Sequence, residues 1–191
     1  MPIAMPPNNS SYQLGVGKVE TISENDIQSL CSLMQEPDNL QVSGRVNRGK
    51  NSLLNKSIRD VQVWVLHEKF TWVDEWIIRW GTMANRDFGL QVTGLIERPQ
   101  ILKYNKGSTG YNWHYDIGDG DASNRKISLS VILDDKCEGG ELCFFTDGEY
   151  TLSPVAGEVI AFPSFFSHRV KPVTDGCRLA LVAWLSGEPL R

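Results

Sequence analysis

The fold is decided by the stretch KISLSVILDDKCEGGELCFFTDGEYTLSPVAGEVIAFPSFFSHRVKPVTDGCRLALVAWL, residues 126–185. It consists of short runs rich in Val, Ile, Leu and Phe, separated by Gly, Pro and Asp. Runs of this length and composition between turn-forming residues are typical of β-strands. The strands expected here span residues 126–133, 142–145, 150–154, 158–162, 168–173 and 179–185.

Upstream of this stretch the same pattern reaches back to residue 90 and predicts strands at 90–95, 100–104 and 111–116, with an isolated strand at 61–66. Many short strands at regular spacing, with no helices between them, favour a sandwich or jelly roll over a parallel α/β sheet. The sequence therefore predicts a mainly β fold with flanking α-helices.

Two segments before residue 90 show helical spacing. In the first, Ser23 is the expected N-cap, Asp26 occupies the acidic position of a capping box, and the helix should stop near Pro37. The second helix opens at Thr71. Its apolar face carries Trp72, Trp76, Trp80 and Met83, with Ile77 and Ala84 beside them. An aromatic stripe at this spacing indicates a helix that packs on a sheet.

Composition favours a single domain over residues 1–191, since the chain has 191 residues and is 41% hydrophobic. Residues 1–58 would supply an N-terminal helix and a lid-like loop, and residues 59–186 the jelly-roll region. The net charge of -4 gives no general attraction to nucleic acid or anionic membrane. The chain has no apolar run of roughly 18 residues and its four cysteines are scattered. Because its first residues lack a basic segment followed by an apolar run, we expect a protein without a secretion signal. These features favour a cytoplasmic protein with reduced thiols.

A polar stretch at residues 41–58 has no clear period and carries Arg45, Arg48, Lys50 and Lys56. Such a stretch is either a solvated loop or a lid over a site. Together with Arg59, these basic residues would suit an acidic substrate or partner, although a solvated loop explains them equally well.

The motif Trp113-His114-Tyr115-Asp116 precedes a glycine-rich loop. In an extended chain, residues two apart point to the same face, so His114 and Asp116 could offer an imidazole and a carboxylate to one metal ion. His168 is the candidate third ligand, because a jelly roll can bring a late strand beside an early one. Two histidines and one carboxylate leave half of an octahedral ion open, which is the arrangement of iron(II) oxygenases. Taken alone, His168 would be interpreted as a hydrogen-bonded structural histidine.

Arg178 directly precedes the apolar run 179–185. Burying an arginine is costly unless it meets an anion, and its planar guanidinium suits a carboxylate bound by two hydrogen bonds. A dicarboxylic 2-oxo acid would supply that anion. The alternative is an arginine at a strand end whose guanidinium reaches water.

An ordered set of segments carries a family resemblance: residues 101–116, Glu138-Gly139-Gly140-Glu141-Leu142, residues 163–168 and residues 172–178. Together they resemble the prolyl 4-hydroxylase-like iron(II)/2-oxoglutarate-dependent dioxygenases, and most closely the PKHD-type hydroxylases. The resemblance runs from about residue 59 to residue 186. It implies a double-stranded β-helix, a cupin-like jelly roll, that uses Fe(II), 2-oxoglutarate and O2, with ascorbate keeping the iron reduced.

The same resemblance implies roles for individual residues. His114, Asp116 and His168 match the iron ligands, and Arg178 matches the basic residue that holds the C5 carboxylate of 2-oxoglutarate. The remaining matches are Tyr104, Leu142, Val170 and Trp184 around the co-substrate and iron, and Tyr111 near the entrance. Tyr111 and Arg59 are the residues expected to contact substrate.

One position departs from the family pattern. Some prolyl hydroxylases place a tyrosine against the C5 carboxylate where this chain has Ile132. Arg178 would then be assisted by Ser128 or Ser130, which share a face with Ile132, or by Tyr104.

The resemblance implies hydroxylation of a prolyl residue in a peptide or protein. A free amino acid or another small molecule is the alternative substrate, and a non-catalytic iron- and 2-oxoglutarate-binding module is the alternative from another class. A halogenase is disfavoured because Asp116 is present. A nucleic-acid demethylase is disfavoured because Trp184 stands where such enzymes carry a second arginine. The expected lids over the site are residues 41–58 and 117–124.

Overall fold

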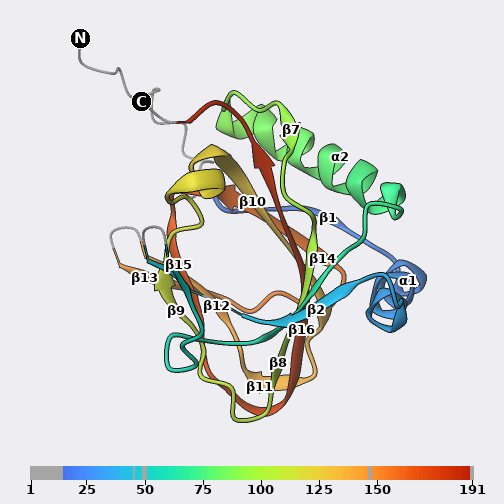
Figure 1. The fold of residues 1–191 in the computed structure, drawn as a ribbon, viewed down its shortest axis with the longest axis vertical. Coiled ribbons are helices and arrows are strands. Elements are labelled where there is room, and N and C mark those ends of the chain that lie inside the picture. Colours follow the sequence, from blue (N-terminus) through green and yellow to red (C-terminus); the bar gives the residue numbers. More distant parts are fainter. Residues whose placement is uncertain (1–14, 45, 49–50, 146–147, 190–191) are drawn as a thin grey trace.

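The computed structural model describes residues 15–44, 46–48, 51–145 and 148–189, and Figure 1 shows two facing β-sheets with helices on the outside. The helices are α1 (Glu24–Ser32), the 3-10 turn η1 (Leu33–Gln35), α2 (Thr71–Phe88) and the 3-10 turn η2 (Gly120–Asn124). The strands are β1 (Gly17–Thr21), β2 (Leu40–Ser43), β3 (Val46–Arg48), β4 (Asn51–Leu53), β5 (Arg59–Asp60), β6 (Gln62–Val65), β7 (Gly94–Leu95), β8 (Gln100–Asn105), β9 (Gly110–His114), β10 (Arg125–Asp134), β11 (Cys137–Gly139), β12 (Leu142–Phe145), β13 (Glu149–Leu152), β14 (Glu158–Pro163), β15 (Ser167–Val170) and β16 (Val173–Ser186).

The sheets are antiparallel and differ in size. The larger has the order β1-β14-β10-β16-β8-β6-β2, with β7 and β11 also paired to β16. The smaller has the order β13-β12-β15-β9-β5, and β3 pairs with β4 separately. Neighbours far apart in the chain, such as β9 and β15, are the result of jelly-roll winding. The predicted mainly β fold with flanking helices is confirmed.

Helix α2 packs on the outer face of the larger sheet, as Figure 1 shows. Its buried face consists of Val73, Ile77, Trp80, Gly81 and Ala84. A Cβ at Gly81 would lie 2.3 Å from the Leu185 side chain, so this glycine lets the helix approach β16 closely. The predicted stripe is wrong at Met83, which is 36% exposed, because the helix turns its Ile77 and Ala84 face to the sheet.

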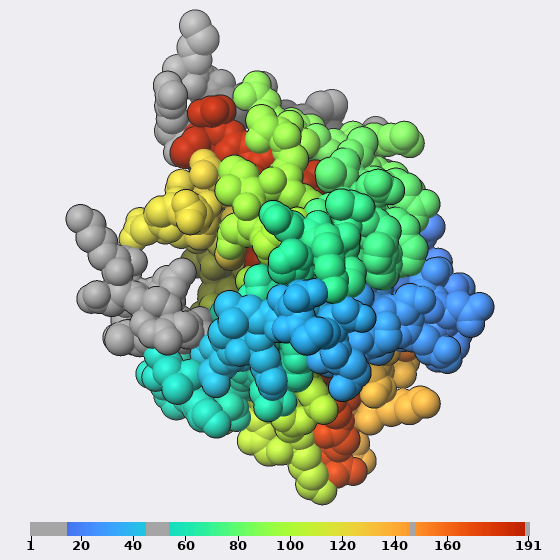
Figure 2. Space-filling model, turned by 45° about the vertical axis from the view of Figure 1, so that its right-hand side comes forward, coloured from blue at the N-terminus to red at the C-terminus, as the bar shows by residue number. Residues whose placement is uncertain are grey.

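Helix α1 begins as predicted. Ser23 is the N-cap, and its side chain and that of Asp26 form the reciprocal bonds of a capping box. The helix continues as η1 and ends at Gln35, just before Pro37. Figure 2 shows this blue segment abutting the teal-green segment that holds α2. Next to them, Lys69, which precedes α2, forms salt bridges with Glu36 at 3.2 Å and Asp38 at 2.5 Å, which follow η1.

The two faces of β10 serve different purposes. Ile127, Leu129 and Val131 belong to the core beneath the helices. A second core fills the space between the sheets and includes Tyr104, Leu142, Phe144, Phe162 and Val170. Ser128 and Ser130, which alternate with the first set, therefore point into the space between the sheets, where the candidate site lies.

The observed strands begin or end at other residues than predicted mainly where the side-chain pattern does not change at the end of the strand. Strand β9 ends at His114 rather than at Asp116, and β16 begins at Val173 rather than at Leu179. The 90–95 strand is reduced to Gly94–Leu95. Strands β1, β2, β3, β4, β5 and β11 were not predicted, and β2, β3 and β4 lie in or beside residues 41–58, which were predicted as a loop. They are short and polar, so pairing with a neighbour rather than local propensity defines them.

Candidate metal centre

His114 and His168 meet because their strands pair. β9 and β15 are antiparallel neighbours, and His114 lies directly opposite His168 in the register. Side chains of directly opposed residues share a face of the sheet. The two imidazole centroids are accordingly 4.1 Å apart, on the face that points between the sheets.

Asp116 completes a group of three. Its Oδ1 lies 3.7 Å from Nε2 of His114, and its Oδ2 lies 3.6 Å from Nε2 of His168. The candidate ligand atoms of the three side chains all lie within 4.8 Å of one another. The structure therefore brings together the three residues that the sequence assigns to the metal.

Hydrogen bonds fix the tautomer of each imidazole. Nδ1 of His114 lies 2.8 Å from the carbonyl oxygen of Asn112, and Nδ1 of His168 lies 2.9 Å from that of Phe166. A carbonyl only accepts, so each Nδ1 carries the proton and each Nε2 keeps its lone pair. Both Nε2 atoms face Asp116. A backbone carbonyl that accepts from Nδ1 in this way is common at metal-binding histidines.

Charge states at the site also suit a cation. Burial and the neighbouring His168 lower the pKa of His114 to about 3. Burial alone would raise the pKa of Asp116, but His168, His114, Arg125 and the Ser128 hydroxyl outweigh it and bring that pKa to about 2. A neutral imidazole and an ionised carboxylate are the protonation states in which these groups bind metals. The residues present therefore fit an iron(II) ion.

Aromatic side chains surround the imidazoles. The Tyr111 ring stacks on that of His114 with centroids 3.5 Å apart. Phe162 packs edge-on against His168 at 4.7 Å. These contacts hold the imidazole rings in place.

A cavity adjoins the three residues on the inner side and has Arg178 in its wall. The other predicted co-substrate residues in this wall are Tyr104, Ser130, Leu142, Val170 and Trp184. Ser128 is not among the lining residues; its hydroxyl donates to Oδ2 of Asp116 at 2.6 Å instead. Of the three candidates to assist Arg178, the structure thus leaves Ser130 and Tyr104 beside the cavity.

Arg178 is a buried cation. It is 5% exposed, and β16 places it directly opposite Tyr104 of β8. Its guanidinium lies 5.5 Å from the Tyr104 ring centroid, and within the described ranges no carboxylate forms a salt bridge with it. Burial lowers its pKa, which reflects the cost of a charge without a counterion. An anionic ligand in the cavity would remove that cost.

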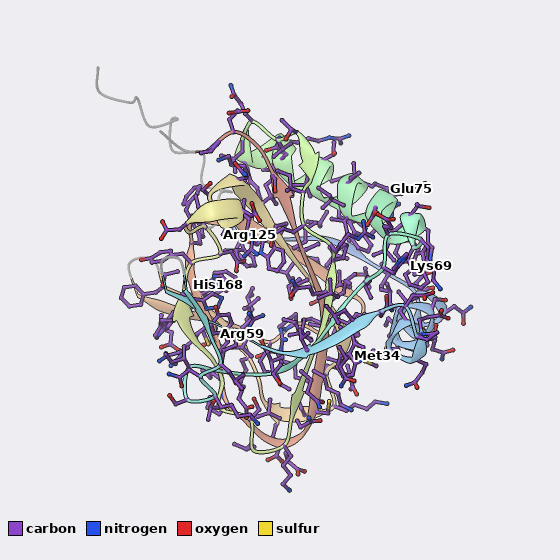
Figure 3. The ribbon with its side chains drawn as sticks, in the orientation of Figure 1. Met34, Arg59, Lys69, Glu75, Arg125 and His168 are labelled. Carbon is purple, nitrogen blue, oxygen red and sulfur yellow. The ribbon has the colours of Figure 1, made fainter. Side chains whose placement is uncertain are left out.

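A wider cleft of about 530 Å³ adjoins His114 and Asp116. Arg59 and Tyr111, the residues expected to contact substrate, both line it, and the Arg59 guanidinium lies 4.8 Å from the Tyr111 ring centroid. Figure 3 shows Arg59, Arg125 and His168 around the same central space. Both expected lids contribute residues to the lining of the cleft. From residues 117–124 these are Ile117, Gly118, Asp119 and Ala122, and from residues 41–58 they are Val42, Ser43, Gly44 and Ile58. Arg45 and Lys50 of the second lid lie outside the described residues, as does the side chain of Arg48.

Sequence reasoning missed several groups at the site. Arg125 forms an ion pair with Glu97, stacks 3.7 Å from the Trp184 ring centroid and donates to the Asp116 carbonyl. Ser164 accepts from the backbone N–H of Asp116 and lies behind Ser128. Arg125 and Glu97 look like surface charges in the sequence, and a backbone acceptor such as Ser164 leaves no sequence signal.

Comparison with known proteins gives matches to one superfamily. Residues 99–186 match the 2OG-Fe(II) oxygenase superfamily. A PKHD-type hydroxylase of Rippkaea orientalis is 35% identical over 112 residues, which cover 54% of this chain and 50% of that protein. The chain thus matches about half the length of that relative.

Solved structures agree in fold. A prolyl-4-hydroxylase of Pseudomonas putida superposes with a TM-score of 0.69 at 20% identity, covering 92% of this chain and 94% of that one. A prolyl hydroxylase of Trichoplax adhaerens, solved with a peptide fragment of the hypoxia inducible factor oxygen degradation domain, gives 0.71 at 17% identity, covering 91% and 84%. At these identities the likeness concerns the fold, and it confirms the predicted jelly roll.

Proposed function

Because this chain resembles the prolyl 4-hydroxylase-like iron(II)/2-oxoglutarate dioxygenases of the PKHD-type branch in sequence and in fold, we propose that it is a dioxygenase that hydroxylates a C–H bond. One observation carries the proposal: His114, Asp116 and His168 converge beside a cavity that contains a buried arginine. A metal-binding group and an anion-binding group in the wall of one cavity are what a 2-oxo diacid requires.

His114, Asp116 and His168 would hold the iron. When bound, the ferrous ion supplies the redox chemistry that couples oxidative decarboxylation of 2-oxoglutarate by dioxygen to substrate hydroxylation. Arg178 would bind the C5 carboxylate, assisted by Ser130 or Tyr104 in the same cavity wall. Leu142 and Val170 would keep water from the co-substrate stem, and Trp184 would close the side toward the cleft. Ascorbate would serve as the reductant that keeps the iron ferrous.

The substrate would enter through the 530 Å³ cleft, past Tyr111 and Arg59. A prolyl residue in a peptide or protein is the first candidate, supported by the prolyl hydroxylases among the structural neighbours. A free amino acid or other small molecule is the second. The third candidate, a non-catalytic module that binds iron and 2-oxoglutarate, is disfavoured by the complete ligand set.

Two broader proposals accompany this function. Residues 1–191 would act as one domain with the site at its centre. Within the described residues no helix combines the length and apolar character needed to cross a membrane. The four cysteines are free thiols, which would suit a cytoplasmic location.

The test is product formation with iron(II), 2-oxoglutarate and oxygen across panels of proline-containing peptides and free amino acids. Succinate should form, and one substrate should gain the mass of an oxygen atom in mass spectrometry. His114→Ala and Asp116→Ala should abolish both signals, whereas Arg178→Ala should mainly raise the 2-oxoglutarate requirement. His67→Ala, which removes the histidine outside the site, is the matched control. Unchanged turnover in His114→Ala would remove the assigned ligand.

A further inference from the structure

Asp116 differs from the other two candidate ligands because it lies outside the sheet. His114 and His168 are held by the β9–β15 pairing, whereas Asp116 lies in the loop two residues beyond the end of β9. Its backbone is fixed from both sides: the N–H donates to the Ser164 carbonyl at 3.0 Å, and its own carbonyl accepts from Arg125 at 3.2 Å. These bonds leave the carboxylate free to rotate, so its orientation needs a separate restraint.

Two buried serines supply that restraint. Ser128 Oγ donates to Asp116 Oδ2 at 2.6 Å, and Ser164 Oγ lies 2.9 Å from Ser128 Oγ. Ser128 is 1% exposed and Ser164 is fully buried. A hydroxyl has one proton, and Ser128 gives its proton to the carboxylate. Ser164 must therefore donate to Ser128, which makes a directed chain from Ser164 through Ser128 to Asp116.

We propose that the Ser164–Ser128 chain is a positioning device that makes Asp116 a one-oxygen metal ligand. This inference rests on the proposed function. Both carboxylate oxygens lie near an imidazole, Oδ1 3.7 Å from Nε2 of His114 and Oδ2 3.6 Å from Nε2 of His168. Oδ2 also accepts the Ser128 hydroxyl, so Oδ1, which has no hydrogen bond among the described groups, is the oxygen that would bind the metal. A carboxylate that bound through both oxygens would occupy a second coordination position, and 2-oxoglutarate needs two adjacent positions to chelate. The serine chain thus both orients the ligand and protects a co-substrate position.

A purely structural role for the serines makes a different prediction. Two buried hydroxyls that only satisfy each other would stabilise the metal-free protein, and their loss would lower its unfolding temperature without a selective effect on the metal. A positioning role predicts a loss of metal affinity larger than any effect on the metal-free fold. Residues that hydrogen-bond to a metal ligand typically contribute about 10- to 100-fold to the affinity for the metal.

The experiment measures affinity for cobalt(II), as an air-stable substitute for iron(II), by calorimetry on the metal-free protein, with the unfolding temperature recorded in parallel. Ser128→Ala should bind cobalt at least about tenfold more weakly. Ser128→Thr, which keeps the hydroxyl, should restore most of the affinity. Ser164→Ala should cause a smaller loss, and the double variant should be no weaker than Ser128→Ala, because Ser164 acts through Ser128. In the iron-loaded protein under argon, Ser128→Ala should also bind 2-oxoglutarate more weakly.

The matched control is Ser186→Ala, since Ser186 is fully buried and its hydroxyl has no hydrogen-bond partner among the described groups. It should leave cobalt affinity unchanged. Ser128→Ala that binds cobalt as tightly as the parent, or more tightly, would overturn the inference. So would additive losses in the double variant. If Ser128→Ala does not fold, Ser164→Ala provides the test. Cobalt affinity equal to that of the parent in Ser164→Ala would overturn the proposed Ser164–Ser128 chain. A parent protein that binds no cobalt would instead sink the proposed metal site itself.

Discussion

Replacing Arg178 with methionine should have opposite effects on the empty and the co-substrate-bound protein. Methionine approximates the length of the arginine stem and removes the charge. In the structure the guanidinium is buried, and the described residues offer it the Tyr104 ring rather than a carboxylate. A buried charge without a counterion costs free energy in the folded state. The empty protein should therefore lose nothing and gain stability.

The size of the effect differs between the protein without 2-oxoglutarate and the protein with 2-oxoglutarate bound. Removing the uncompensated charge should stabilise the empty protein by about 1 kcal/mol or more, which is a rise of about 2–4 °C in unfolding temperature for a chain of this size. In the bound state, truncating one partner of a buried charge pair costs about 2–5 kcal/mol. At about 1.4 kcal/mol per factor of ten, 2-oxoglutarate affinity should fall between about 30-fold and about 3,000-fold.

The assay is thermal unfolding of the metal-loaded protein under argon, with and without 2-oxoglutarate, together with a 2-oxoglutarate titration. 2-Oxoglutarate should raise the unfolding temperature of the parent. Without 2-oxoglutarate, Arg178→Met should unfold at a higher temperature than the parent, and adding 2-oxoglutarate should raise that temperature only slightly. Arg79→Met is the matched control, since Arg79 is exposed and pairs with Glu20 far from the cavity. A large loss of stability in Arg178→Met without 2-oxoglutarate would mean that the arginine has a structural partner, and would contradict this prediction. Unchanged 2-oxoglutarate affinity would refute it equally.

Three further predictions concern glycines and a lid. Gly140→Ala should weaken 2-oxoglutarate binding in titration, because a Cβ there would lie 3.0 Å from Cδ of Arg178; unchanged binding would contradict this. Gly110→Ala should lower the unfolding temperature far more than Gly107→Ala, since both have positive φ but only Gly110 would press a Cβ to 2.2 Å from the Val170 carbonyl oxygen. Equal losses would mean that backbone strain, not the contact, dominates. Residues 117–124 should resist proteolysis once metal, an inert 2-oxoglutarate analogue and substrate are bound; equal cleavage with and without them would remove the lid hypothesis.

The sequence predicted individual residues correctly in two situations: where apolar and polar residues alternate along a strand, and where a residue type is unusual for its surroundings. Ile127, Leu129 and Val131 alternate with Ser128 and Ser130, so the two faces of β10 could be predicted, and the structure separates them in this way. The combination of His114, Asp116, His168 and Arg178 stood out because an arginine among apolar residues and a histidine two residues from an aspartate suggest ligands.

What remained unpredictable depends on contacts between distant segments. The register that sets His114 opposite His168 is a property of the β9–β15 pairing and has no local signature. Ser128 was one of three residues predicted to assist Arg178, together with Ser130 and Tyr104, and its hydroxyl donates to the Asp116 carboxylate in the loop after β9. Arg125 and Glu97 are 28 residues apart, and only the folded chain makes them partners.

In the proposed function, His114, Asp116 and His168 would bind a single ferrous ion and leave room for 2-oxoglutarate to chelate it. The most direct measurement is a titration of metal-free protein with iron(II) under argon, in the presence of 2-oxoglutarate, followed by the visible charge-transfer absorption of the chelate. The absorption should saturate at a single equivalent of iron in the parent and in His67→Ala, and it should not appear in folded Asp116→Ala. Absence of the band in the parent, or a parent-like titration in Asp116→Ala, would contradict this prediction.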